Sequence, residues 1–148
     1  MSLEKQRKKA ITLYCDGSSL GNPGPGGYGG ILSYNGVKKS YSGGEAHTTN
    51  NRMELKAVIE GLKLLKESCN VEIVSDSSYV VKAINEWLDG WVAKKFAKVK
   101  NVDLWQEYIE ASKPHTVSGT WIKGHAGHTE NEICDKMAKD EAMKFKGP

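Results

Sequence analysis

The stretch YGGILSYNGVKKSYS, residues 28–42, predicts two strands joined by a tight turn and so decides the first part of the fold. Asn35-Gly36 lies between two runs of bulky residues, and this dipeptide favours the two-residue turn of a β-hairpin. Residues 11–15 also alternate bulky side chains and lead into Asp16-Gly17, which predicts a strand that ends in a turn. The first three strands are therefore expected to form an antiparallel meander, with the Gly- and Pro-rich residues 18–27 as a loop.

Beyond residue 42, helical periods alternate with short strand patterns. The expected elements are a helix over 51–67, a buried strand over 71–75, a helix over 77–88, an irregular basic segment over 91–100, a helix from Asn101, a strand over 117–121 and a final helix from Thr129. Asn101 is a candidate N-cap, and residues 129–132 (TENE) have the spacing of a capping box. Ile133, Met137 and Ala138 are expected to face the core. A meander followed by helix-separated strands predicts an α/β fold with a mixed sheet flanked by helices.

Composition limits the class of protein. The chain has 148 residues, with 39% hydrophobic and 26% charged, which fits one globular domain. No apolar run approaches the roughly 20 residues of a membrane helix, so no membrane partner is expected. Residues 1–9 are polar and basic, which predicts a tail rather than a secretory signal, and Met1-Ser2-Leu3 could be a cloning remnant. Three cysteines without C-x-x-C spacing favour a reducing, cytoplasmic setting over a disulfide framework or a zinc ribbon.

Four acidic residues occupy positions where expected elements begin or end. Asp16 follows the first strand and Asp76 follows the fourth, so both would emerge at one sheet edge if these strands are parallel neighbours. Glu54 lies in the first turn of a helix, and Asp135 lies in the first two turns of the last helix. Both helices can bring their carboxylates over the same edge.

Carboxylates gathered in this way would repel one another and raise each other's pKa. Mg²⁺ or Mn²⁺ would relieve this repulsion, because hard cations prefer oxygen ligands. Two such ions about 4 Å apart can flank a phosphodiester. The alternative is that each acid is merely a helix cap or a solvated charge, and the residues alone leave both interpretations open.

Five strings of the sequence resemble bacterial ribonuclease HI, of the ribonuclease H type 1 family. They are YCDGSSLGNPGPGGYGGIL (14–32), HTTNNRMEL (47–55), VSDSSYV (74–80), KNVDLW (100–105) and WIKGHAGHTENEICDKMA (121–138). They occur in the family's order, and the resemblance covers about residues 10 to 143. Long, mutually ordered motifs make chance similarity a poor explanation.

The resemblance implies a ribonuclease H-like fold with a five-stranded mixed sheet, order 3-2-1-4-5, and helices on both faces. A single domain would cover residues 10–145. The implied activity is endonucleolytic hydrolysis of the RNA strand of RNA–DNA hybrids, leaving 5′-phosphate and 3′-hydroxyl ends. A cytoplasmic monomer that uses two Mg²⁺ ions, or Mn²⁺, is the expected form.

The resemblance also assigns catalytic and metal-binding roles. Asp16 would bridge two metal ions, Glu54 and Asp76 would complete one site, and Asp135 the other. His125 matches the loop histidine that handles a proton or helps product leave. A zinc pair of His125 and His128 is the weaker alternative, because it lacks Cys partners and lies beside hard oxygen ligands.

Further matches concern the hybrid. Asn22 and Asn50 would lie beside the RNA strand, whose 2′-hydroxyl distinguishes it from DNA. The residues that match the DNA side of the family's binding surface are Thr49, Asn101, Tyr79, Trp87 and Trp91. Trp87 also falls on the apolar side of its expected helix, so core packing is the competing interpretation.

A basic patch follows Trp91. Lys94, Lys95, Lys98 and Lys100 lie within seven residues without an acid, which suits contact with a duplex backbone. This protrusion is shorter than in the best-known bacterial pattern and lacks a third tryptophan. Hybrid binding is therefore expected to be weaker or more salt-sensitive, while the chemistry should survive.

Two other functions share these features. A non-catalytic hybrid-binding module would usually have lost a carboxylate, and this chain retains all four. An integrase or a reverse-transcriptase domain could share the fold, but HTTNNRMEL and GNPGPGG are typical of the stand-alone cellular type.

Overall fold

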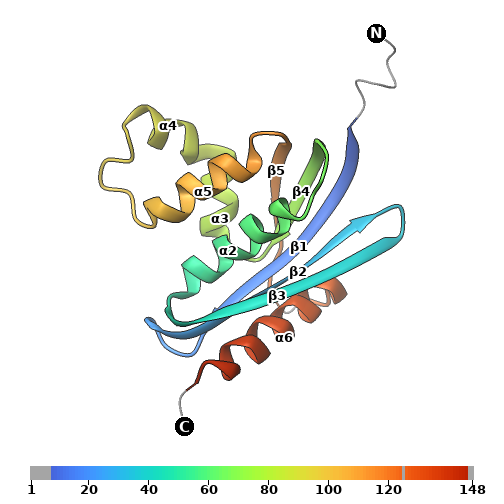
Figure 1. Ribbon diagram of the computed structural model, residues 1–148, viewed down its shortest axis with the longest axis vertical. Coiled ribbons are helices and arrows are strands. Elements are labelled where there is room, and N and C mark those ends of the chain that lie inside the picture. Colours follow the sequence, from blue (N-terminus) through green and yellow to red (C-terminus); the bar gives the residue numbers. More distant parts are fainter. Residues whose placement is uncertain (1–7, 125, 147–148) are drawn as a thin grey trace.

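The computed structural model describes residues 8–124 and 126–146. Five strands form one sheet in the order β3-β2-β1-β4-β5 (Figure 1). Their bounds are β1 Lys9–Ser19, β2 Gly24–Tyr34, β3 Val37–Thr48, β4 Cys69–Ser75 and β5 Thr116–Trp121. β1, β2 and β3 pair antiparallel, whereas β4 pairs parallel with both β1 and β5. The expected mixed α/β sheet and its strand order are confirmed. His125 and most of the expected basic tail lie outside the described residues.

Helices cover both faces of this sheet. They are α2 Asn50–Lys63, α3 Ser78–Lys82, the π-helix η1 Ala83–Trp87, α4 Leu88–Ala93, α5 Val102–Ser112 and α6 Thr129–Lys144. Alternate glycines of β2 show the two faces, because Gly27 and Gly29 abut α6 while Gly26 abuts Met53 of α2. In Figure 1, α6 lies across β2 and β3, away from α2 and α5. No helix among the described residues is both long and apolar enough to cross a membrane.

The core lies between the sheet and the face of α2. Leu13 and Cys15 of β1 and Ile73 of β4 are fully buried, as is Trp105 of α5. They meet the apolar side of α2, which contributes Leu55, Val58, Ile59 and Leu62. Burial of these side chains is the main favourable contribution to folding, at about 25 cal/mol per Å² of apolar surface. The core thus fixes α2 over β1 and β4.

The loop expected over 18–27 is mostly strand. Ser18 and Ser19 pair with Gly27 and Gly26, so only residues 20–23 separate β1 from β2. These glycines serve close approach rather than a loop, since a Cβ on Gly26 would lie 2.9 Å from the Ser18 carbonyl oxygen. The next helix is also shorter than expected and ends at Lys63.

One of the two expected helix caps is confirmed in position only, and the other is wrong. Asn101 does precede α5, but it has a left-handed φ of 59° and its side chain does not cap the helix. α6 begins at Thr129 after His128 without any side-chain cap, so residues 129–132 form no capping box. The Asn101 side chain instead bonds Tyr79 and Arg52, which lie elsewhere in the fold.

The buried side of α6 also differs from the expected one. Ile133 is 46% exposed, whereas Cys134, Ala138 and Ala142 are buried. Gly27 and Gly29 bring the β2 backbone close to α6 at Ala138 and Cys134. The expectation for Ala138 is confirmed, that for Ile133 is wrong, and Met137 is half-buried.

Candidate active site

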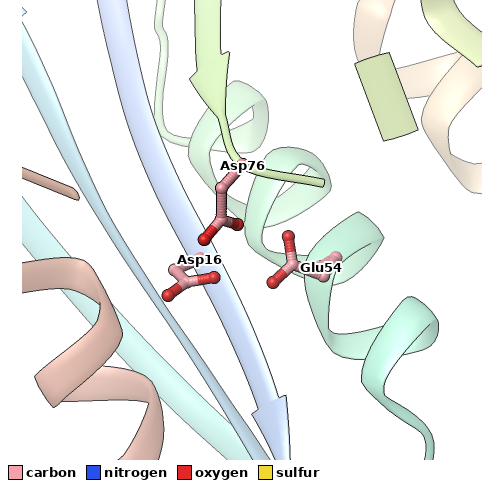
Figure 2. A group of neighbouring side chains, drawn as sticks. All are labelled: Asp16, Glu54 and Asp76. Carbon is pink, nitrogen blue, oxygen red and sulfur yellow. The ribbon is translucent and has the colours of Figure 1, made fainter. Parts of the chain in front are cut away.

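Three carboxylates meet at the carboxyl ends of β1 and β4. Asp16, Glu54 and Asp76 each offer an oxygen within 4.8 Å of the others (Figure 2). Asp16 comes from β1, Asp76 follows β4, and Glu54 comes from the first turns of α2. The parallel β1–β4 pair ends at Tyr14 and Val74, two residues before each aspartate, which places both side chains at one edge.

Asp135 lies near these three residues but outside the tight cluster. It comes from α6 and lines, with them, an open cleft of about 420 Å³ that Asn50 and Tyr79 also border. Its carboxylate forms an ion pair with Lys139 at 3.0 Å. The structure therefore brings all four candidate acids to one cleft, with three of them in immediate proximity.

Burial governs the electrostatics of the cluster. Asp16 and Glu54 are only 5% and 4% exposed. Burial raises the pKa of Asp16 to about 7, and the Asp76 charge adds to this rise, while a hydrogen bond with Glu54 opposes it. Burial and then Asp16 raise the pKa of Glu54 well above its ordinary value. The cluster is thus a desolvated group of oxygen donors that favours either protons or a cation.

Backbone and hydroxyl groups orient these carboxylates. The N–H of Gly17 donates to Asp16 Oδ1 at 2.9 Å and to Glu54 Oε1 at 2.8 Å. The Ser75 hydroxyl lies 3.5 Å from Glu54 Oε2. None of Asp16, Glu54 and Asp76 forms an ion pair with another residue that the structure describes. An all-oxygen donor set without a bound cationic side chain fits a hard divalent metal ion.

A second pocket lies beside the cleft. Asn22, Thr49, Asn50 and Asn101 line a cavity of about 220 Å³, together with Lys100. Asn22 Oδ1 accepts from the Asn50 N–H at 3.0 Å, and Thr49 caps α2 by accepting from the Arg52 N–H. Four of the candidate substrate residues therefore share one pocket, although they come from three distant parts of the chain.

A hydrogen-bond network joins this pocket to the core. The Tyr79 hydroxyl accepts from Asn101 Nδ2 at 3.2 Å and from Trp105 Nε1 at 2.8 Å. Arg52 donates to Asn101 Oδ1 and forms two hydrogen bonds with Asp103. Gly17, Ser75 and Arg52 were missed as functional candidates. No local pattern marks them, because their partners lie far away in the sequence.

The basic protrusion leaves the body of the molecule through η1 and α4 (Figure 1). Lys94, Lys95 and Lys98 are exposed there. Trp87 is 40% exposed and its ring centroid lies 5.9 Å from that of Trp91. Trp87 is part neither of the buried core nor of the side chains packed against it, so its core-packing interpretation is wrong. Trp91 packs edge-on against Trp105, 5.4 Å between ring centroids, which anchors the protrusion.

Comparison with known proteins gives the family. The family model described as RNase H matches residues 8–143. This chain belongs to the ribonuclease H family. The ribonuclease H of Sulfurovum sp. (strain NBC37-1) is 69% identical over 144 residues, covering 97% of this chain and 98% of that protein. The ribonuclease HI of Helicobacter pylori (strain ATCC 700392 / 26695) is 60% identical over 134 residues, covering 90% and 94%.

Solved ribonuclease H structures share the fold. LC9-RNase H1 superposes with a TM-score of 0.85 at 31% identity, covering 94% of this chain and 74% of that chain. LC11-RNase H1 in complex with an RNA/DNA hybrid superposes with a TM-score of 0.68 at 22% identity, covering 90% and 97%. The resemblance of the five sequence strings to ribonuclease HI is confirmed by these comparisons.

Within this ribonuclease H domain, one candidate residue has no described position. His125 lies outside the described residues, and with it the alternative zinc pair with His128. Among the residues that are described, the group of side chains placed to hold a metal ion is Asp16, Glu54 and Asp76.

Proposed function

We propose that this protein hydrolyses the RNA strand of RNA–DNA hybrids by an endonucleolytic, two-metal-ion reaction that leaves 5′-phosphate and 3′-hydroxyl ends. The observation that carries the proposal is the buried cluster of Asp16, Glu54 and Asp76, with Asp135 in the same cleft, in a chain of the ribonuclease H family. A desolvated cluster of this kind costs stability unless a cation or protons neutralise it.

Each carboxylate has a part in holding the metal ions. Asp16 would bridge the two ions, Glu54 and Asp76 would complete one site, and Asp135 the other. When bound, Mg²⁺ or Mn²⁺ would supply an activated water and stabilise the leaving oxygen. The Gly17 N–H keeps the Asp16 and Glu54 oxygens in fixed orientations, so the donor set is formed before a metal ion arrives. His125 would handle a proton or help product leave.

Residues around the cleft would bind the two strands. Asn22 and Asn50 would contact the RNA strand, and Glu54 would accept from a 2′-hydroxyl. Thr49 and Asn101 would hold a phosphate of the DNA strand at the N-terminus of α2. Tyr79, Trp87 and Trp91 would line the DNA channel, and Lys94, Lys95 and Lys98 would contact phosphates. We further propose that the protein acts as a cytoplasmic monomer.

The test is cleavage of a labelled RNA–DNA hybrid in Mg²⁺, beside single-stranded RNA and duplex DNA of the same sequence. We expect cleavage of the RNA strand of the hybrid alone. Asp16→Asn should abolish turnover yet keep hybrid binding, because it removes a metal-binding charge with little change in volume. Asp140→Asn is the matched control, since Asp140 lies on the exposed side of α6 and pairs with Lys136.

Three outcomes would contradict the proposal: no cleavage of the hybrid, equal cleavage of single-stranded RNA, or full activity of Asp16→Asn. Hybrid binding without cleavage by the unaltered protein would instead favour the non-catalytic binding module.

A further inference from the structure

Asn131 lies in the first turn of α6, four residues before Asp135. Residues four apart share one face of a helix, so the two side chains point toward the same region. Asn131 and Asp135 both line a small enclosed cavity of about 10 Å³ that Asp16 and Asp76 also border. Asn131 is therefore an uncharged polar residue of α6 that lies beside Asp16, Asp76 and Asp135.

The Asn131 side chain ties α6 to β4 beside the cluster. Its Nδ2 donates to the Val74 carbonyl at 3.2 Å, two residues before Asp76. The nearby helix residue Cys134 has its Sγ 3.4 Å from the Tyr14 carbonyl, two residues before Asp16. Tyr14 and Val74 form the last pair of the β1–β4 ladder. The first turns of α6 thus contact both β1 and β4 at the point where the pairing of these two strands ends.

These two side-chain contacts, rather than a capping hydrogen bond, hold the first turns of α6 to the sheet. His128 holds the N-cap position of α6, and its side chain makes no capping hydrogen bond to a described residue. Elsewhere, α6 packs on β1, β2 and β3 rather than on β4. The Asn131–Val74 bond is therefore the side-chain link between the helix that carries Asp135 and the strand that leads to Asp76, among the residues that the structure describes.

The other end of the same amide has no partner. Because the Val74 carbonyl can only accept, Nδ2 must face it and Oδ1 must point elsewhere. Oδ1 is fully buried without a hydrogen-bond donor among the described residues. An unsatisfied buried acceptor of this kind costs about 1–3 kcal/mol. Oδ1 itself is closed to water in this structure, so the contact that this amide contributes is its Nδ2 bond to Val74.

We propose that Asn131 is a positioning residue for the metal centre: its amide N–H holds the helix that carries Asp135 against the strand that leads to Asp76, and so sets how the two carboxylates that would hold a cation lie relative to each other. This inference rests on the proposed function of the carboxylate cluster. Residues that orient metal ligands without binding the metal themselves typically change metal affinity or activity by about 10–100-fold when they are replaced.

The experiment compares Asn131→Ala with Asn85→Ala, first without nucleic acid. Asn85 is the matched control because its amide also bonds a sheet backbone, at Gly119, but outside the carboxylate cleft. Mn²⁺ affinity is measured by calorimetry, and the melting temperature of each metal-free variant is recorded. We expect Asn131→Ala to weaken Mn²⁺ binding by about 10-fold or more, and Asn85→Ala to leave it unchanged.

Cleavage then separates positioning from structure. For Asn131→Ala, the Mg²⁺ concentration at half-maximal rate should rise by the same factor, and excess Mg²⁺ should recover most of kcat with KM for the hybrid unchanged. Asn131→Ser, whose shorter hydroxyl cannot span to the Val74 carbonyl, should show the same loss and serves if the alanine variant does not fold.

The outcomes distinguish the two proposals. Unchanged Mn²⁺ affinity in both Asn131 variants, with only a lower melting temperature, would overturn the positioning role alone. An equal loss in Asn85→Ala would overturn it too, because the effect would then be general destabilisation. Failure of the unaltered protein to bind Mn²⁺ would overturn the proposed function as well.

Discussion

The backbone N–H of Gly17 donates a 2.8 Å hydrogen bond to Oε1 of Glu54, which joins the end of β1 to the first turns of α2. The two backbones are so close that a Cβ on Gly17 would overlap the backbone atoms of Met53 and Glu54. This contact brings the Glu54 carboxylate against Asp16 and depends on the absence of a side chain at position 17.

Gly17→Ala should therefore damage both stability and metal binding. The added methyl group meets backbone that cannot rotate away, and overpacking of this kind costs about 1–3 kcal/mol of unfolding free energy. Urea denaturation and Mn²⁺ calorimetry measure the two effects. Gly90→Ala is the control, because nothing lies within 4 Å of a Cβ there. Wild-type stability and Mn²⁺ affinity in Gly17→Ala would contradict the role of this contact.

The metal-free protein should lose stability as pH rises from about 4 to about 7. Burial holds the pKa of Asp16 at about 7, whereas the unfolded chain releases that proton near its ordinary value of about 4. In this window the folded state binds more protons, so the free energy of unfolding falls as pH increases. Mg²⁺ should consequently stabilise the protein more at pH 8 than at pH 5.

Denaturation in EDTA across this pH range, with Asp16→Asn alongside, tests this dependence. His115 acts in the opposite direction, because burial lowers its pKa. The quantity to examine is therefore the difference between wild type and Asp16→Asn, in which the contribution of His115 cancels. A difference that does not change between pH 4 and pH 7 would contradict the raised pKa of Asp16.

Tyr79→Phe should lower both the stability of the fold and the affinity for the hybrid. The substitution leaves the fully buried Trp105 indole N–H without its acceptor, which costs about 1–3 kcal/mol. It also removes one of the two side-chain hydrogen bonds that hold Asn101 in the pocket wall, so KM for the hybrid should rise while kcat stays near wild type. Thermal unfolding and steady-state cleavage measure these changes. Tyr34→Phe is the control, and equal effects in both variants would argue against the network.

Replacing Lys94, Lys95 and Lys98 together by Gln should weaken hybrid binding without altering kcat. If all three lysines bind phosphates, the slope of log affinity against log salt should become shallower by up to about 0.9 for each phosphate that is no longer neutralised. Binding is measured at several salt concentrations. Gln at Lys39, Lys66 and Lys113, which are exposed elsewhere, removes the same charge. An equal change in that control would mean that net charge, and not this protrusion, governs binding.

Much of the fold could be predicted because its signals are local. The Asn35-Gly36 turn and the alternating strands depend on neighbours within a few residues, and these elements are present. Asn101 takes its predicted N-cap position, but its side chain bonds Tyr79 and Arg52 instead of its own helix. Ile133 is exposed because the side of α6 that faces the β2 glycines carries Cys134 and Ala138.

The sequence by itself determined the family and the four acidic residues, because long motifs such as VSDSSYV and NNRMEL carry both. Only the tertiary structure decided which of these residues meet. Asp16, Glu54 and Asp76 form the close group because β1 and β4 are parallel and Gly17 admits α2. Asp135 lies beside Asp16 and pairs with Lys139, but it is not part of that close group. The role proposed for Asn131 also depends on the tertiary structure. It rests on the hydrogen bond to Val74, 57 residues away, which no local sequence pattern indicates.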